Sequence, residues 1–412
     1  MINQLFTFPS TIERLRQGPL NEHLDAYATV VAEQGYAPNS IRRQIVVIAD
    51  LSRWLLQKHI EMPSLDNNVV DRFLKIRGRQ DGIRRGDART LNRFLSFLRQ
   101  TGCVGPGRER PIKSPRQCVI DGFQHYLLHE RRLSLATSHN YLPVIEQFLS
   151  EQFHRKALNL SAIRALDVTG FVRRHVNQLS PGRAALMVTA LRSFFRYLLR
   201  RGDVAIDLSG CVPAVPKWSL SVVPRYLPAD TVERVLDSCD RLTSIGRRNY
   251  AILLLLARLG LRAGEVVGLN LEDIDWQEGL LAIRGKGGKS VLLPLPADVG
   301  EAITAYLRRD RPRCSVRSLF IRHRAPLIGF RNSLAISTLA MRALKQAGVE
   351  SAHTGAHVFR HSLATNLLRE GCSLDEIGEL LRHQSPNTTA IYAKVDLTAL
   401  RTLALPWPGG AR

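Results

Sequence analysis

The sequence lacks several features that would place it in common protein classes. No apolar run approaches the length needed to cross a bilayer, and the longest one is Ala251–Ala257. The N-terminus, which begins Met1-Ile-Asn-Gln-Leu-Phe, has no basic region followed by an apolar one, so we expect no signal peptide. The six cysteines are scattered and form no CxxC pair, which favours reduced thiols in a cytoplasmic protein and disfavours a cysteine-based zinc site.

Acidic residues are few relative to basic ones. The 412 residues include 58 Lys and Arg against 36 Asp and Glu, which gives a formal net charge of +22. Such an excess predicts a polyanionic partner, because each neutralised phosphate releases condensed counterions. A basic protein of membrane surfaces is the competing class, but the sequence has no amphipathic Lys-rich helix and no lipidation motif. The composition, 45% hydrophobic and 23% charged, is typical of a globular chain long enough for two or three domains.

The N-terminal half contains an internal repeat. Leu91–Leu98 followed by Gly102 corresponds to Leu191–Leu198 followed by Gly202, at a constant offset of 100 residues. Apolar residues recur in both at the spacing of one helix face, and the glycines are natural C-terminal caps. We therefore predict two tandem four-helix modules, at residues 1–105 and 116–207. The alternative is that any two amphipathic helices resemble each other.

Each predicted module also contains a long helix that follows a short one. In the first module the long helix is expected to begin at an N-cap formed by Asn39 or Ser40. A further helix and the closing helix complete each module. The expected pairs of short and long helical segments are His23–Ala32 with Gly35–Lys58, and Asp121–Glu130 with Arg131–Phe153.

A basic stretch joins the two modules. Between Asp71 and Arg116 there are 13 basic and 4 acidic residues. Its Gly- and Pro-rich part, Gly102–Pro115, is predicted to be a linker. Arginines here suit contacts with phosphates, which position DNA without reading its sequence, although a solvated basic face is the alternative. The candidate DNA-contacting residues in this stretch are Arg84, Arg85, Arg89 and Arg93, and two further candidates, Lys289 and Arg382, lie in the C-terminal half.

The C-terminal half begins after a second predicted linker, residues 208–227, which we expect to act as a hinge between two halves that close around a duplex. A capping box at Asp230–Glu233 is expected to open the first helix of a domain at residues 228–412. Two strands are expected to form a hairpin whose Gly-rich tip carries Lys286 and Lys289. The expected strands are Gly279–Arg284 and Ser290–Leu295, and the expected helices are Arg247–Leu259, Ala297–Arg309 and Ser333–Ala347.

Side chains suited to chemistry gather near the end of the chain. His357, Arg360 and His361 lie in a helix predicted at Gly355–Glu370, and His383 and Tyr392 follow within a few turns. Imidazole and guanidinium groups suit an anionic, oxygen-rich transition state, and a phenol can serve as its nucleophile. These residues predict phosphodiester chemistry on DNA.

Two further helix starts separate these residues. Ser373 begins a capping box, and Ser385 with Pro386 forms an N-cap followed by proline at the first helical position. Tyr392 is therefore expected to lie on a short helix that begins a few residues after His383.

Taken together and in order, these residues resemble the tyrosine recombinases, or phage-type integrases. The resemblance implies a mainly α fold with a small antiparallel β-hairpin, in which tandem helical, SAM-like DNA-binding modules precede an α+β catalytic domain. A second HxxR at His129 and Arg132 shows that each element alone is a weak signal. The ordered set carries the resemblance: Arg262 in LGLRAGE, Lys286 in the hairpin, His357-x-x-Arg360, His383 and Tyr392.

The resemblance implies a catalytic role for each residue. Tyr392 would attack a scissile phosphate and form a 3′-phosphotyrosyl link that stores the bond energy, so that resealing needs no ATP. Arg262 and Arg360 would hold the non-bridging oxygens with planar guanidinium groups. Lys286 would protonate the leaving 5′-oxygen.

The remaining roles concern proton transfer and positioning. His357 would help to take the tyrosine proton, and His383 would donate a hydrogen bond to the phosphate. Glu265 would orient Arg262. The resemblance implies no cofactor and no metal, and no cluster of carboxylates in the sequence suggests one.

Several alternatives stay open for individual residues. Lys289 could replace Lys286, His361 could replace His357, and Tyr392 could be a packed helix tyrosine. The family usually has glycine where this chain has Arg382, whose side chain could contact a phosphate or point to solvent.

Three functions remain at this point. The first is strand exchange for a mobile element, as an integrase or transposase, which the extra N-terminal module favours. The second is a housekeeping resolvase or a type IB topoisomerase-like enzyme, and the third is a DNA-binding protein without catalysis. The apolar tail from Val395 to Arg412 suggests docking on a neighbouring subunit, and hence a homotetramer on two DNA duplexes.

Overall fold

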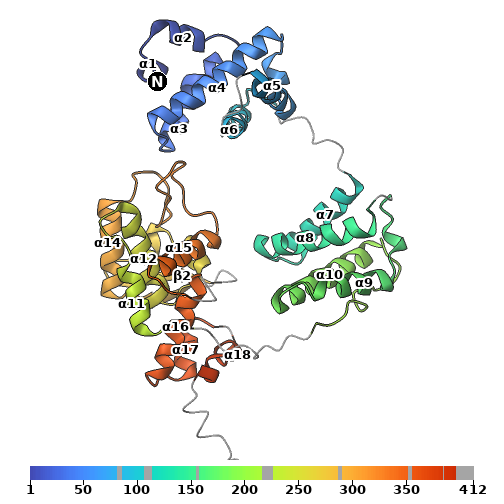
Figure 1. Ribbon diagram of the computed structural model, residues 1–412, viewed down its shortest axis with the longest axis vertical. Coiled ribbons are helices and arrows are strands. Elements are labelled where there is room, and N and C mark those ends of the chain that lie inside the picture. Colours follow the sequence, from blue (N-terminus) through green and yellow to red (C-terminus); the bar gives the residue numbers. More distant parts are fainter. Residues whose placement is uncertain are drawn as a thin grey trace, which may run out of the picture. The chain divides into compact units, whose positions relative to one another are not determined.

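The computed structural model confirms the predicted fold class, because the chain is mainly helical with one three-stranded antiparallel sheet (Figure 1). Contacts divide the chain into one unit formed by residues 1–105 and 222–412 and a second formed by residues 106–221. We describe each part by itself, and the domain boundaries drawn from the sequence stay a prediction. The structure describes residues 1–80, 86–105, 114–154, 157–215, 226–285, 290–350, 355–383 and 385–395.

The first helical module contains the four expected helices and two short ones before them. Its core is aromatic: the Tyr27 and Phe94 rings meet edge to face at 5.1 Å, and the Tyr27 hydroxyl donates to Gln44. The expected N-cap at Asn39 or Ser40 is wrong: Pro38 occupies the first helical position, where its missing N–H costs nothing. The helices are α1 (Ile2–Leu5), α2 (Pro9–Leu15), α3 (Asn21–Glu33), α4 (Pro38–Gln57), α5 (Asn67–Gln80) and α6 (Asp87–Gln100).

The second module repeats this order of elements around its own core. Phe123, Phe148, Phe194 and Phe195 are fully or almost fully buried there and contact one another through their ring edges. A single π-helical turn, Tyr126–Glu130, extends the first helix. The helices are α7 (Pro115–His125), α8 (Leu135–Gln152), α9 (Ala165–Val176) and α10 (Pro181–Arg201).

The closing helices of the two modules end in the same way. Gly102 and Gly202 adopt left-handed backbone conformations with φ of 74° and 78°. The backbone N–H after each glycine donates to the carbonyl of the leucine at the start of the turn, at 2.9 Å for Leu98 and 3.0 Å for Leu198. The offset of 100 residues seen in the sequence therefore extends to the hydrogen bonds of the helix ends.

The start of the second predicted linker is packed. Leu208 and Val212 are buried in the core of the second module, and the Arg192 guanidinium donates to the Val212 carbonyl at 3.0 Å. These residues therefore form part of the module, and the segment from 216 to 225 lies outside the described residues.

The C-terminal half is built around α12 (Ser244–Arg258), whose residues Ala251–Leu256 are buried on all sides. This helix packs against α11, α14, α15 and α16 (Figure 1). Beside these helices lies the sheet β1 (Ile274–Asp275), β2 (Leu280–Arg284) and β3 (Ser290–Pro294), with Ala282 opposite Leu292. The other helices are α11 (Ala229–Asp237), α13 (Ala263–Gly268), α14 (Ala297–Arg309), α15 (Ser333–Gln346), α16 (Ala356–Arg369), α17 (Leu374–Leu380) and α18 (Pro386–Thr389).

Two local expectations for this half are wrong. The residue before α11 is Pro228, which makes no side-chain cap, and Glu233 instead binds the Arg258 guanidinium at 2.6 and 3.1 Å. Tyr392 does not lie on the helix after His383, because α18 ends at Thr389 and Tyr392 begins a separate 3₁₀ turn, Tyr392–Val395. The hairpin is confirmed, and the capping box at Ser373 forms as expected. No helix within the described ranges is long and apolar enough to cross a membrane.

Gly260 follows α12 at a point where a side chain does not fit. Its φ is +55°, and a Cβ atom would lie 2.7 Å from Leu381 Cδ2. We predict that Gly260→Ala lowers the free energy of unfolding by about 1–3 kcal/mol, from the left-handed backbone and from crowding. Urea unfolding measures this change. Gly268→Ala is the control, because a Cβ there meets nothing within 4 Å. Equal losses in the two variants would contradict the prediction.

Candidate active site

Helix α16 carries three of the candidate residues. Positions i, i+3 and i+4 of a helix lie on neighbouring parts of one surface, and His357, Arg360 and His361 have this spacing. The two imidazole rings lie 6.3 Å apart. His357 is exposed, His361 is half-buried and Arg360 is only 4% exposed.

The buried Arg360 guanidinium joins two other segments of the domain. It donates to the carbonyl of Gly260 at 2.5 Å and to the carbonyl of Leu381. Burial, together with the nearby Arg262 and Arg382 guanidinium groups, lowers the pKa of Arg360 to about 10. The group therefore stays charged at neutral pH and is held in place by two backbone oxygens.

Arg262 stands at the N-cap of α13 and is held by Glu265. One carboxylate oxygen of Glu265 accepts from the Arg262 guanidinium at 2.7 Å, and the other accepts from the Arg262 backbone N–H at 2.9 Å. Burial of Glu265 opposes its ionisation, but these two hydrogen bonds outweigh burial and lower its pKa. The Arg262 side chain is 40% exposed, whereas that of Glu265 is 8% exposed. The arrangement agrees with the expectation that Glu265 orients Arg262.

Tyr392 is buried within the last turn of the described chain. Its side chain is 1% exposed, and its hydroxyl lies 2.9 Å from His361 Nδ1. Burial raises the pKa of Tyr392 to about 12, while the charges of Arg360 and Arg262 act in the opposite direction. The phenol is therefore protonated at neutral pH, and it needs a proton acceptor to become a nucleophile.

His383 lies against the Tyr392 ring. The two rings are nearly parallel, at 5°, with centroids 6.5 Å apart. His383 Nδ1 lies 2.7 Å from the hydroxyl of Thr389, which is buried. Burial, followed by the charge of Arg360, lowers the pKa of His383 to about 4. The imidazole is neutral at pH 7, and its Nδ1 either accepts from the Thr389 hydroxyl or donates to it, depending on which ring nitrogen carries the proton.

The structure brings together most of the predicted catalytic residues. The cluster is shown by the contacts of Tyr392 with His361 and His383, by the charge effects of Arg262 and Arg360 on Tyr392, and by the 6.3 Å between the His357 and His361 rings. Lys286 and its alternative Lys289 lie outside the described residues. Among residues that the structure describes, no group of three or more His, Cys, Asp or Glu could hold a metal ion, and metal-independent chemistry stays a prediction.

The predicted DNA-contacting arginines differ in their surroundings. Arg89 is exposed on α6. Arg93 is half-buried, donates to Gln44 at 3.2 Å and lies over the Tyr36 ring at 4.7 Å. Arg84 and Arg85 fall outside the described residues. Arg382 points inward and binds Glu265, so the alternative that its side chain points to solvent is wrong.

Two residues of the cluster stand out more in the structure than in the sequence. The sequence offers His361 only as an alternative to His357, and in the structure His361 Nδ1 lies 2.9 Å from the Tyr392 hydroxyl. Thr389 was not singled out, although it orients His383. The only sequence signals were the positions of His361 directly after Arg360 and of a hydroxyl on the turn after His383.

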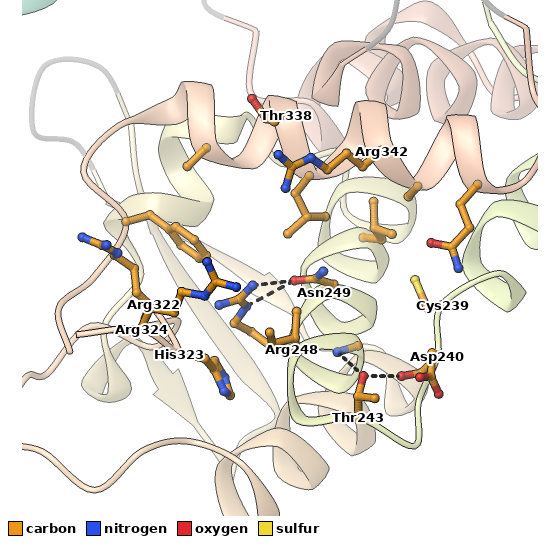
Figure 2. Close-up of a pocket in the computed structure, with 18 of the residues that line it drawn as sticks. Cys239, Asp240, Thr243, Arg248, Asn249, Arg322, His323, Arg324, Thr338 and Arg342 are labelled. Atoms are coloured by element: carbon orange, nitrogen blue, oxygen red, sulfur yellow. Dashed lines mark hydrogen bonds between the residues drawn. The ribbon is translucent and has the colours of Figure 1, made fainter. Parts of the chain in front are cut away.

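A separate cavity of about 800 Å³ lies between α12, α15 and the segment around residues 322–332 (Figure 2). Arg248 lines it, is 8% exposed, and donates to Asn249 and to the Ile321 carbonyl at 3.1 Å. Its guanidinium also lies 5.0 Å from the Phe330 ring centroid. The cavity shares no lining residue with the Tyr392 cluster, so it is not part of the candidate active site.

Comparisons with known proteins agree with this geometry. The profile of the phage integrase family matches residues 225–398, and that of the phage integrase N-terminal SAM-like domain matches residues 120–202. The putative integrase/recombinase y4rA of Sinorhizobium fredii is 44% identical over 402 residues, which cover 97% of this chain and 98% of that protein.

Two further likenesses each cover about two-thirds of the chain. The tyrosine recombinase XerD of Listeria innocua is 32% identical over 290 residues, which cover 69% of this chain and 96% of that protein. The crystal structure of the XerH site-specific recombinase, bound to a palindromic difH substrate in a post-cleavage complex, matches with a TM-score of 0.55 at 20% identity. That match covers 71% of this chain and 97% of the XerH chain.

The chain therefore belongs to the phage integrase family of tyrosine recombinases, the enzymes that break and rejoin DNA. The match to the SAM-like domain precedes the match to the phage integrase family along the chain.

The lowered pKa of His383 predicts how stability depends on pH. Since the folded pKa, about 4, lies below the ordinary value of 6.5, the unfolded chain binds the proton more readily. Neutral His383 makes its full contribution to the free energy of unfolding above its ordinary pKa. This contribution is lost as the pH falls towards the pKa of His383 in the folded protein. We predict that His383→Gln loses less stability than wild type between about pH 7 and about pH 5. Urea unfolding at the two pH values measures this. Equal losses in both proteins would contradict the prediction.

Proposed function

We propose that the chain catalyses site-specific strand exchange on double-stranded DNA through a covalent link between Tyr392 and a 3′-phosphate. The observation that carries this proposal is the contact of the Tyr392 hydroxyl with His361, in a cluster that also includes Arg262, Arg360 and His383. A buried phenol, a neighbouring base and two guanidinium groups are the components that phosphodiester transfer requires.

The proposed cleavage step exchanges one bond to phosphorus for another and moves two protons. The Tyr392 oxygen bonds to phosphorus as the bond to the 5′-oxygen breaks, and the phenolic proton passes to an imidazole. His361 takes this proton in our proposal, because its Nδ1 already lies 2.9 Å from the hydroxyl. Lys286, by resemblance to the family, donates a proton to the leaving 5′-oxygen. Attack by a 5′-hydroxyl of the partner strand reverses the step, so neither ATP nor a metal is needed.

The charges of the site suit the transition state of this step. Arg262 and Arg360 remain cationic and face the non-bridging oxygens, where negative charge accumulates. In this proposal Thr389 donates to His383 Nδ1, so neutral His383 carries its proton on Nε2 and donates a hydrogen bond to the same phosphate. This intact set of groups disfavours the alternative of a DNA-binding protein without catalysis.

The length of the chain favours a mobile-element enzyme over a housekeeping resolvase. The match to y4rA, named as a putative integrase/recombinase, covers 97% of the chain, whereas the match to XerD covers 69%. The match to y4rA therefore includes the first helical module of this chain. We propose that this module contacts DNA through basic side chains that include the exposed Arg89.

We predict that the wild-type protein forms an SDS-resistant adduct with nicked suicide duplexes that contain the element's ends, and that Tyr392→Phe does not. The phenylalanine keeps the buried ring but removes the oxygen that bonds to phosphorus. Gel electrophoresis after SDS treatment measures the adduct. The absence of an adduct with wild type would refute the proposed function, and an adduct that persists in Tyr392→Phe would refute the nucleophile assignment.

His361→Ala and His357→Ala form a matched pair in the same assay. Loss of a general base slows its step by roughly 10²–10⁴-fold. His361→Ala should therefore reduce the single-turnover cleavage rate by more than His357→Ala does. A larger reduction of the cleavage rate in His357→Ala than in His361→Ala would instead assign the general base to His357.

For the first module we predict a strongly salt-dependent contribution to DNA affinity. Each phosphate contact adds roughly 0.9 to the steepness of the slope of log binding constant against log salt concentration. Arg89→Ala should reduce this slope by about one contact without changing the preferred site. Fluorescence anisotropy at several salt concentrations measures it. If deletion of residues 1–105 leaves affinity and slope unchanged, the module does not bind DNA.

The assembly that acts on DNA is proposed to be a homotetramer that holds two duplexes, with the tail beyond Asp396 docked on a neighbouring subunit. Sizing of the protein–DNA complex tests this. A truncation after Asp396 that still forms the four-subunit complex would count against the role of the tail.

A further inference from the structure

Arg382 occupies a backbone position that favours glycine. It follows α17 with φ of +56°, a left-handed conformation in which L-residues other than Gly, Asn and Asp are uncommon. The turn is closed by hydrogen bonds from the backbone N–H groups of Arg382 and His383 to the carbonyls of Glu379 and Gly378, both at 2.9 Å. Arginine at this position therefore costs conformational free energy in the backbone. This cost points to a function for the Arg382 side chain.

The Arg382 side chain reaches from this turn to α13. Its Nη2 donates to Glu265 Oε2 at 3.0 Å, and its Nη1 donates to the Leu380 carbonyl at 2.9 Å. Both Arg382 and Glu265 have side chains only 8% exposed, and the ion pair joins residues 117 positions apart in the sequence. Arg382 Nε is also buried and lacks a hydrogen-bond partner among the described residues. The guanidinium is thus directed into the protein and away from solvent.

Glu265 consequently joins two arginines. Its Oε1 accepts from the Arg262 guanidinium, while its Oε2 is shared by the Arg262 backbone N–H and Arg382. A carboxylate bound on both oxygens has one orientation, and so does the guanidinium attached to it. Without Arg382 this buried carboxylate would lose a charge-assisted hydrogen bond and could rotate, which would release the half-exposed Arg262.

We propose that Arg382 is a positioning residue that acts through Glu265 to fix the Arg262 guanidinium in the place where it meets the scissile phosphate. This inference rests on the proposed function of Arg262. It differs from a direct DNA contact, which requires a guanidinium accessible to phosphate oxygens. The Arg382–Glu265 ion pair thus lies behind the candidate active site and reaches it through the Arg262 guanidinium.

The decisive variant is Arg382→Gly, because glycine suits the left-handed backbone and so keeps the turn while removing the ion pair. We predict a roughly 10- to 100-fold lower single-turnover cleavage rate at saturating suicide duplex, as expected for a misplaced catalytic group. The affinity for uncleaved DNA and its salt slope should stay as in wild type. Thermal unfolding verifies that the variant is folded.

A double-mutant cycle tests the route through Glu265. Because Arg382 acts through that carboxylate, Arg382→Gly should have little further effect on cleavage in a Glu265→Gln background. If Arg382 acted independently of Glu265, the fold-reductions in cleavage rate caused by the two single substitutions would multiply in the double variant. That result would overturn the inference. A salt slope reduced by about 0.9 in Arg382→Gly, with normal cleavage at saturation, would assign Arg382 to a phosphate contact instead.

A measurement without catalysis separates this inference from the proposed function. In protein labelled with ¹⁵N-arginine, the guanidinium signals of Arg262, assigned with Arg262→Lys, should be resolved in wild type and broadened in Arg382→Gly. Unchanged Arg262 signals would overturn the positioning role even if no DNA substrate is cleaved. A wild type that shows ordered Arg262 signals but forms no adduct would instead refute the proposed function alone.

Discussion

The buried guanidinium of Arg360 is the interaction on which the catalytic half depends. It lies on α16 between two apolar clusters, one that includes Phe359 and one that includes Ala364 and Tyr392. By donating to the carbonyls of Gly260 and Leu381, it ties the end of α12 and the turn after α17 to the same helix. A buried cation with only neutral partners is costly, so these two bonds must be satisfied for the domain to fold around it.

This constraint explains the distribution of charge around the site. Arg262, Arg360 and Arg382 converge on a region where Glu265 supplies the carboxylate, so an anion entering there meets excess positive charge. Burial first, and then the charges of Arg360 and Arg262, lower the pKa of His383. Partial desolvation of the His357 ring, whose surface is otherwise exposed, and the same two charges lower the pKa of His357. The imidazoles therefore stay neutral, and neutral imidazoles can accept or donate a proton beside the phosphate.

The sequence predicted those parts of the fold that depend on local signals. Ala297–Arg309 was expected as a helix and forms α14 with the same bounds, and the hairpin strands pair as expected. The two-residue strand β1 has too few residues for a recognisable pattern. In the site, the cluster as a whole followed from an ordered family motif. The inward path of Arg382 did not, because its partner Glu265 lies far away in the sequence and only the tertiary fold brings the two together.

The choice between His357 and His361 shows the limit of motif reasoning in physical terms. One turn of helix separates them, and both flank Arg360, so spacing alone cannot decide which imidazole reaches the phenol. The decision depends on where the last turn places Tyr392, and that turn is held by apolar contacts with Ala364, Ile377 and Leu381. Packing in this small cluster, and not the motif, therefore decides which imidazole contacts the Tyr392 hydroxyl. Because burial in the same cluster raises the pKa of Tyr392, it also keeps the proposed nucleophile protonated until a neighbouring group accepts its proton.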